Sequence, residues 1–402
     1  MFSRHKQSSH LGDVYIAREV TMLGQNAQAN SSLNSRNVFF VLGCYRSGTS
    51  AITRVLPVFG VKLYGHLMEP GPANKRGFWE NEDIHKINHS VSNLIGITEK
   101  ISPGSINAEI LAKKSLYPDL LSCAVEELNR GFQTSSYIGI KNPHCSRLLI
   151  FWQEAIRRAG GREHYIIALR NPRSAVCSLR AFMKTQRPMG YAVWLEYTVR
   201  AVQDTIGKPR VIVAYEDLLE DPILQVQRIG RELGLNGQIN QKELEFYTDQ
   251  YIDRKLEHVH YDGFDLKKHC RELPIVADVY ELLLQRAAEQ VDEKTFVRRW
   301  EPLYERYCIE MPEFYRANPK MMDPKPEHWI NHAWYRIQHV GLKESMHWLL
   351  THGPKRAWTS VAQMGRRDKN DYAVAGSSQN GSDKQKSGSL GQNKMHLSNI
   401  SN

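Results

Sequence analysis

The sequence lacks the patterns that mark several large classes of protein. Its six cysteines are scattered and form no CxxC pair, which argues against a zinc site or a redox dithiol and indicates reduced, mostly buried thiols. The N-terminal residues contain no apolar stretch of about seven, and no segment approaches about 18 consecutive apolar residues. We therefore expect neither a signal peptide nor a transmembrane helix, and a cytoplasmic location.

Three catalytic signatures are missing as well. There is no GxSxG elbow, no GxGxxG after a strand and no HExxH. His85 and His89 stand four residues apart in HKINH, which is the spacing of a metal pair on a helix, but the glutamate of the zinc motif is missing. An ordinary amphipathic helix face explains the pair, so we predict no metal.

Positive charge is abundant but is not concentrated. The chain has 53 Lys and Arg against 43 Asp and Glu, a net charge of +10, which favours anionic ligands such as nucleotides, nucleic acids, acidic glycans or a membrane surface. No run of about five basic residues occurs, and aromatic residues are not interleaved at the regular spacing of single-strand binders. We therefore expect no nucleic-acid partner.

Short apolar runs alternate with helical periodicity over the first half of the chain. The runs are typical of buried strands, and a parallel sheet is expected when such strands alternate with helices. We predict an α/β fold with a doubly wound parallel sheet of about four to five strands, a P-loop-like phosphate cradle and a helical C-terminal extension. The predicted strands are 37–43, 137–141, 164–170 and 209–215, and the predicted helices between them are 49–59, 147–160, 172–183, 192–207 and 221–234.

Composition divides the chain into four predicted regions. They are a flexible leader (1–36), the main domain (37–310), a helical C-terminal extension (311–364) and a disordered tail rich in Ser, Gly, Asn, Gln and Lys (365–402). Helical patterns at 275–291 and 294–308 are expected to pack on the sheet and close the acceptor side. The amphipathic, aromatic segment 327–353 predicts either a helical hairpin docked on the core or a contact with a partner or a membrane surface.

The first predicted strand runs directly into GCYRSGTS, residues 43–50, and then into a helix. Small residues let the backbone amides turn inward, and the helix N-terminus adds positive potential, so the loop is typical of a phosphate cradle. The spacing of Gly43 and Gly48 matches a nucleoside-triphosphate loop, but Thr49 stands where that motif has lysine. With Arg46 inside the turn, the loop suits a single phosphate without metal; the alternative is a purely structural turn.

Two later junctions repeat one pattern. A strand ends at Lys141 and is followed by Asn-Pro, and another ends at Arg170 and is followed by Asn-Pro, where asparagine is a favoured N-cap and proline a favoured first helical residue. Because parallel strands end at the same edge of a sheet, Arg46, Lys141 and Arg170 are expected to converge on one crevice. Three converging cations indicate an anionic ligand.

Together, GCYRSGTS and ALRNPRSAVCSL resemble the two nucleotide-binding signatures of the sulfotransferase family, which uses 3′-phosphoadenosine 5′-phosphosulfate (PAPS). In that family the first loop binds the 5′-phosphosulfate, and the second supplies an arginine and, eight positions later, a serine to the 3′-phosphate. KNPHCSRL is similar to the lysine-Asp/Asn-Pro segment of many bacterial and tyrosylprotein sulfotransferases, so Lys141 is expected to help bind the reacting group. The resemblance implies donor contacts from Arg46, Ser47, Gly48, Thr49, Ser50, Arg170 and Ser178.

The sequence also departs from part of that family. Animal cytosolic sulfotransferases have lysine where Arg46 stands and an adenine-stacking tryptophan where Ala51 stands, and their RKG loop near the C-terminus is not found here. The chain therefore resembles the bacterial, Golgi-like branch of the P-loop sulfotransferases more closely. This leaves the adenine contacts unassigned.

Sulfuryl transfer needs in-line positioning, cations that balance charge and a base for the acceptor hydroxyl. Arg46 and Lys141 are the expected cations. GFWE resembles a glycine-aromatic-Glu segment frequent in bacterial sulfotransferases, so Glu80 is the first candidate base, with a pKa raised by its aromatic neighbours. The alternative is that Glu80 only caps the helix beginning near residue 81; Glu69 and His66 are the reserve candidates.

These patterns predict a PAPS-dependent sulfotransferase that acts on an acceptor hydroxyl, without metal. By family analogy we expect a carbohydrate or a glycolipid as acceptor, and peripheral membrane contact is compatible with this. Two alternative hypotheses are a phosphotransferase or kinase with an atypical P-loop, and a non-enzymatic nucleotide-binding scaffold.

Overall fold

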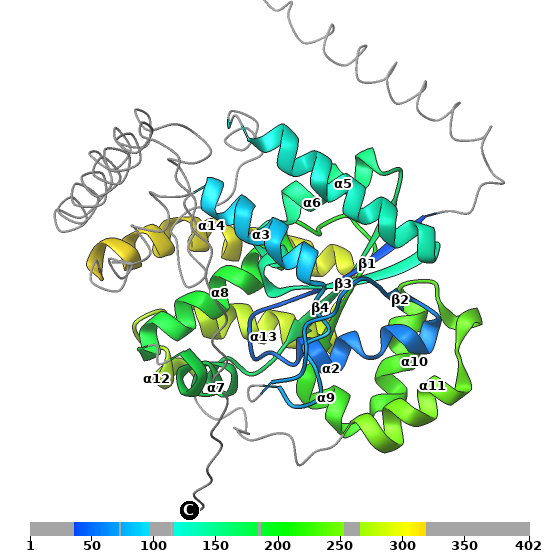
Figure 1. Ribbon diagram of the computed structural model, residues 1–402. Helices are drawn as coiled ribbons and strands as arrows, with labels where there is room; N and C mark the ends of the chain where they lie inside the picture. Colours follow the sequence, from blue (N-terminus) through cyan, green and yellow to red (C-terminus); the bar gives the residue numbers. More distant parts are fainter. Residues whose placement is uncertain are drawn as a thin grey trace, which may run out of the picture.

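A parallel sheet of five strands forms the centre of the molecule (Figure 1). The computed structural model describes residues 36–71, 74–95, 114, 116–183, 186–252 and 266–318. The strand order is β2-β3-β1-β4-β5. The strands are β1 (Asn37–Leu42), β2 (Lys62–Leu63), β3 (Tyr137–Lys141), β4 (Arg162–Leu169) and β5 (Arg210–Ala214). In the register of the central strand β1, Val38 lies opposite Ile138 of β3 and Glu163 of β4. The predicted parallel α/β sheet is confirmed.

Helices cover both faces of the sheet because β1 is apolar at every inner position. Val38, Phe40 and Leu42 pack into one core cluster and Phe39 and Val41 into the other, and all five are almost fully buried. The first cluster is covered by α3 (Glu82–Leu94), α5 (Tyr117–Thr134), α6 (Leu149–Arg158), α7 (Pro172–Met183), α8 (Arg187–Gln203), α13 (Ile275–Ala287) and α14 (Glu293–Ala317). The second is covered by α2 (Thr49–Thr53), η1 (Leu56–Phe59), α9 (Tyr215–Glu220), α10 (Pro222–Glu232), α11 (Gln241–Phe246) and η4 (Tyr247–Tyr251).

The elements differ from the prediction in several places. The helix expected at 49–59 is split into α2 and the 3-10 turn η1, which contains Pro57. Strand β2 and helices α5, α9 and α11 were not predicted. The segments 327–353 and 365–402 and residues 1–35 of the leader lie outside the described residues, and the proposed regional boundaries stay a prediction.

Buried polar contacts attach the C-terminal helix α14 to α8. The carboxylate of Glu196 on α8 accepts hydrogen bonds from the hydroxyls of Tyr307 (2.7 Å) and Tyr315 (3.1 Å) on α14. Burial raises the pKa of Glu196, and the nearby Arg147 opposes that shift. Hydrogen-bonded tyrosines are therefore needed to satisfy a carboxylate that is 3% exposed.

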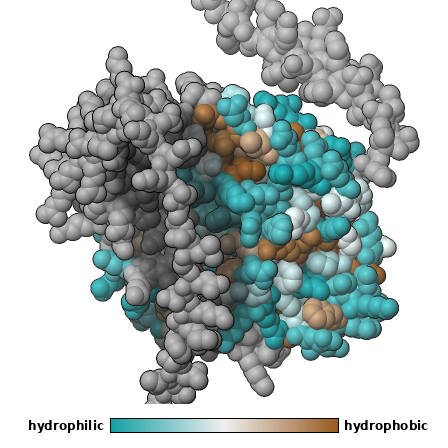
Figure 2. Space-filling view, in the orientation of Figure 1, coloured by the Kyte–Doolittle hydropathy of each residue, from teal (hydrophilic) through white to brown (hydrophobic). Residues whose placement is uncertain are grey.

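Where described residues form the surface in Figure 2, it is mostly hydrophilic with small separate hydrophobic patches. Among the described helices, none combines the length and apolar character needed to cross a membrane.

Candidate functional site

The turn after β1 forms a compact loop at the carboxyl edge of the sheet. Gly43 (φ 138°) and Gly48 (φ 80°) both adopt conformations that L residues rarely take, and Gly48 is the N-cap of α2. A Cβ at Gly43 would lie 2.8 Å from the Ala168 carbonyl oxygen, and one at Gly48 would lie 2.1 Å from the Tyr215 ring. Both glycines are therefore required sterically, as expected of a cradle whose backbone approaches its neighbours closely.

Two of the predicted strand-end junctions meet directly. Arg46 Nε donates to Ser178 Oγ (2.9 Å), and an Arg170 Nη donates to the Arg46 carbonyl oxygen (2.9 Å). The Arg170 guanidinium lies over the Tyr215 ring at 4.8 Å. Burial, together with the positive charge of Arg170, lowers the pKa of Arg46. The structure thus brings two guanidinium groups and the predicted serine together, which is an arrangement that favours an anion.

Buried hydroxyls beside this junction fit an anionic group. The side-chain oxygens of Ser47 and Ser174 are buried and have no hydrogen-bond partner among the described residues. A buried hydroxyl of this kind normally has a partner, and a phosphate oxygen is a suitable acceptor. Asn171 caps α7 as predicted, because its Oδ1 accepts from the amides of Arg173 (2.9 Å) and Ser174 (3.3 Å).

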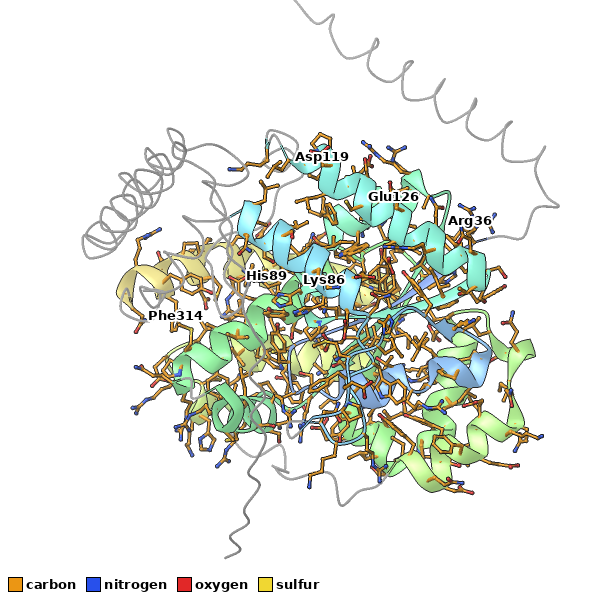
Figure 3. All side chains as sticks on the ribbon, in the orientation of Figure 1. Arg36, Lys86, His89, Asp119, Glu126 and Phe314 are labelled. Carbon is orange, nitrogen blue, oxygen red and sulfur yellow. The ribbon has the colours of Figure 1, made fainter. Side chains whose placement is uncertain are left out.

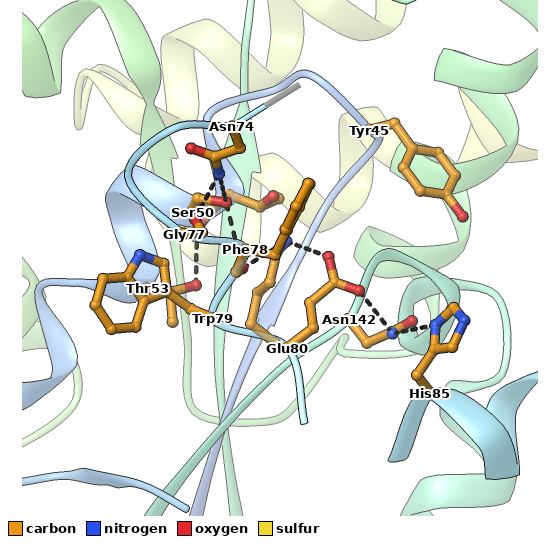
Figure 4. A network of polar contacts seen from close by, with 12 residues as sticks. Tyr45, Ser50, Thr53, Asn74, Gly77, Phe78, Trp79, Glu80, His85 and Asn142 are labelled. Carbon is orange, nitrogen blue, oxygen red and sulfur yellow. Dashed lines mark hydrogen bonds and ion pairs between the residues drawn. The ribbon is translucent and has the colours of Figure 1, made fainter. Parts of the chain in front are cut away.

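Glu80 lies in a buried cluster at the end of β3 (Figure 4). Its Oε1 is 2.5 Å from Lys141 Nζ, and its Oε2 accepts from Asn142 Nδ2 (2.9 Å). Lys141 Nζ also donates to the Phe78 carbonyl oxygen (3.1 Å). Glu80 is 8% exposed and Lys141 is 4% exposed. The alternative that Glu80 caps the next helix is wrong, because Asn81 is the N-cap of α3.

The Phe78 carbonyl oxygen connects this cluster to the phosphate loop (Figure 4). Ser50 Oγ donates to it (3.4 Å) and also accepts from Asn74 Nδ2 (2.9 Å). The Ser50 side chain is therefore engaged by the GFWE turn, while the neighbouring Thr49 is buried. The turn that carries Glu80 is thus connected to helix α2, which follows the phosphate loop.

Histidines and a tyrosine border the same cluster. His85 Nδ1 lies 3.3 Å from Asn142 Nδ2, and Tyr45 Oη lies 2.7 Å from His144 Nε2. Burial, with smaller contributions from His85, Arg147 and His89, lowers the pKa of His144 to about 3. Tyr45 and His144 were not predicted, although both stand inside the motifs GCYRSGTS and KNPHCSRL.

Three further candidates, His66, Glu69 and His89, lie at the surface. His89 is exposed on α3 (Figure 3), and the reserve bases His66 and Glu69 are exposed. Within the described ranges, no group of three His, Cys, Asp or Glu side chains is arranged to hold a metal ion. A hollow of about 960 Å³ lies at the opposite, amino edge of the sheet, where Arg162 and Lys208 contribute to its lining, so it is separate from the cradle.

Comparison with known proteins identifies the class. Residues 39–238, which include the phosphate loop, the Glu80 cluster and the Arg170 junction, match the model described as the sulfotransferase family. Through this region the chain belongs to the sulfotransferase family, which supports sulfotransfer as its general activity.

The solved structures similar to the chain include two sulfotransferases. One is the sulfotransferase domain of the olefin synthase from Synechococcus PCC 7002, with 17% identity and a TM-score of 0.33 over 62% of this chain and 89% of that one. The other is a sulfotransferase from Mycobacterium avium, with 15% identity and a TM-score of 0.34 over 68% of this chain and 81% of that one. A search of curated proteins found no match.

Proposed function

We propose that the chain transfers a sulfuryl group from PAPS to an acceptor hydroxyl. The observation that carries this proposal is the junction of Arg46, Arg170 and Ser178, which come from two strand ends more than 100 residues apart. Loop residues 46–50 would hold the 5′-phosphosulfate, and Arg170 and Ser178 would hold the 3′-phosphate. The unpartnered hydroxyl of Ser47 supports an oxyanion ligand at this loop.

In the proposed reaction, the acceptor oxygen attacks sulfur as its proton passes to the Glu80 carboxylate. An oxygen–sulfur bond forms, the bond from sulfur to the 5′-phosphate oxygen breaks, and the electron pair leaves on that oxygen to give 3′-phosphoadenosine 5′-phosphate. Arg46 would balance the charge that develops on the leaving phosphate. Lys141, buried against Glu80, holds that carboxylate in place beside the loop.

The acceptor that we propose is a carbohydrate or a glycolipid, and this part rests on the family alone. Its hydroxyl would approach from the side of Glu80.

Thermal unfolding with added nucleotides tests the donor assignment. We expect 3′-phosphoadenosine 5′-phosphate to raise the unfolding temperature and AMP and ATP to have little effect, because only the bisphosphate reaches both junctions. Stabilisation by ATP with magnesium would favour the phosphotransferase instead. Tight binding of the bisphosphate without transfer to any hydroxyl would favour the scaffold.

Transfer from labelled PAPS in Glu80→Gln tests the base. We expect turnover to fall on the order of 100-fold or more, the usual contribution of a general base, while bisphosphate binding is kept. Unchanged turnover would remove Glu80 from this role.

A further inference from the structure

Trp79, immediately before Glu80, has an unusual backbone conformation. Its φ is 60°, and in the described part of the chain only Arg46 and Glu289 are other non-glycine residues with positive φ. For a bulky aromatic residue this region is a genuine outlier, and such strain persists only where the surroundings enforce it. The turn before Glu80 must therefore be held by specific contacts.

Lys141 contacts both neighbours of Trp79, the backbone of Phe78 and the side chain of Glu80. Its Nζ bonds to the Phe78 carbonyl oxygen (3.1 Å) and to Glu80 Oε1 (2.5 Å). The backbone conformation of Trp79 therefore sets the direction of the Glu80 side chain relative to the Phe78 carbonyl group.

The indole ring is fixed from another part of the chain. Trp79 Nε1 donates to Tyr251 Oη (2.9 Å), and the two rings meet edge to face at a centroid distance of 6.2 Å. Tyr251 is 8% exposed and lies in η4, 172 residues further along the chain. The contact is thus a partly buried, directional hydrogen bond between distant segments.

Tyr251 is in turn attached to the first turn of α2. Its hydroxyl donates to the Ser50 carbonyl oxygen (3.5 Å), and its neighbour Tyr247 donates to the Ala51 carbonyl oxygen (3.1 Å). Burial raises the pKa of Tyr251, so its hydroxyl stays protonated and can donate. Through Tyr251, the turn carrying Glu80 is connected to helix α2, which follows the phosphate loop.

Building on the proposed function, we propose that Trp79 and Tyr251 are positioning residues, whose hydrogen bond holds the strained turn and aims the Glu80 carboxylate at the acceptor hydroxyl beside the phosphate loop. Neither side chain takes part in proton transfer. A displacement of about 1 Å at a reacting group is enough to cost on the order of 100-fold in rate, so a lost positioning bond has a measurable effect on turnover.

The test compares Tyr251→Phe and Trp79→Phe with wild type, using transfer from labelled PAPS. Each variant keeps an aromatic ring and removes one partner of the hydrogen bond. We expect kcat to fall on the order of 10-fold in either variant and no further in the double variant, because both remove the same bond. The affinity for 3′-phosphoadenosine 5′-phosphate should stay within about two-fold of wild type.

The decisive measurement repeats Tyr251→Phe in the Glu80→Gln background. If Tyr251 acts through Glu80, the second substitution causes no further loss once the carboxylate is gone. Tyr165→Phe is the matched control, since this buried tyrosine hydroxyl donates to Glu163 (2.7 Å) on β4, outside the site. It should leave kcat unchanged.

Several results would overturn the inference. An equal loss from Tyr251→Phe in both backgrounds would mean that it acts independently of Glu80, and a loss of bisphosphate affinity alone would make it a nucleotide contact. Full turnover in Glu80→Gln with normal bisphosphate binding would refute the base and its positioning but leave the donor assignment intact. Failure of wild type to bind the bisphosphate would instead refute the proposed function itself.

Discussion

Replacing His144 should change how the stability of the protein depends on pH. His144 is 5% exposed, its Nε2 is hydrogen-bonded to Tyr45, and burial lowers its pKa from 6.5 to about 3. The folded protein therefore keeps this ring neutral where the unfolded chain protonates it. Because the folded pKa is depressed, the stabilisation is complete above pH 6.5 and is lost progressively as the pH falls from there towards 3.

The size of the effect follows from these two pKa values. One pH unit corresponds to about 1.36 kcal/mol for one proton. At pH 5, about 1.5 units below the unfolded value, His144 should lower the free energy of unfolding by about 2 kcal/mol relative to neutral pH. This is a large fraction of the stability of a typical protein.

Urea unfolding of wild type and His144→Gln at pH 7 and pH 5 measures how the free energy of unfolding depends on this histidine. Glutamine keeps a neutral hydrogen-bonding side chain but cannot take up the proton, and the other histidines contribute equally to both proteins. We expect wild type to lose about 2 kcal/mol more than the variant between the two pH values. Equal losses would show that His144 is protonated in the folded protein and would refute the reasoning.

Three further substitutions test other parts of the structure. Gly48→Ala should abolish bisphosphate binding and lower the melting temperature, because its Cβ would meet the Tyr215 ring at 2.1 Å and the left-handed conformation alone costs about 1–2 kcal/mol. Arg170→Ala should weaken bisphosphate binding in calorimetry by about 1.5–3 kcal/mol, the value of a charge-assisted contact, and equal affinity would contradict the 3′-phosphate assignment. Tyr307→Phe should lower the free energy of unfolding in urea by about 1–3 kcal/mol, since Glu196 loses a buried donor, and an unchanged value would mean that water replaces the hydroxyl.

The sheet was predictable because its main strands are continuous apolar runs, as in β1, where every residue is buried. The two-residue strand β2 is too short to produce a pattern, and its pairing with β3 depends on the tertiary fold. The break between α2 and η1, at residues 54–55, comes just before Pro57, which lacks the amide needed to continue an α-helix. The apolar periodicity of 49–59 continues across that break, which is why one helix was predicted there.

The site was predictable where backbone topology decides it. Arg46 and Arg170 meet because parallel strands end at one edge, and the asparagine caps follow from local sequence. Side-chain partners were not predictable: Lys141 pairs with Glu80 across 61 residues, and the hydroxyl of Ser50 turns to the GFWE turn. Such contacts depend on rotamers and on the placement of distant segments, which local patterns do not encode.

The central position of β1 has a consequence for biosynthesis. Although β1 is made early, it pairs only with β3 and β4, and its last partner is Ile167. At about 5–20 residues per second, the roughly 125 residues between Leu42 and Ile167 take about 6–25 s to emerge from the ribosome. Until β3 emerges the apolar strand β1 has no partner, and its other edge stays unpaired until β4 is complete, so newly made chains should depend on chaperones during that interval.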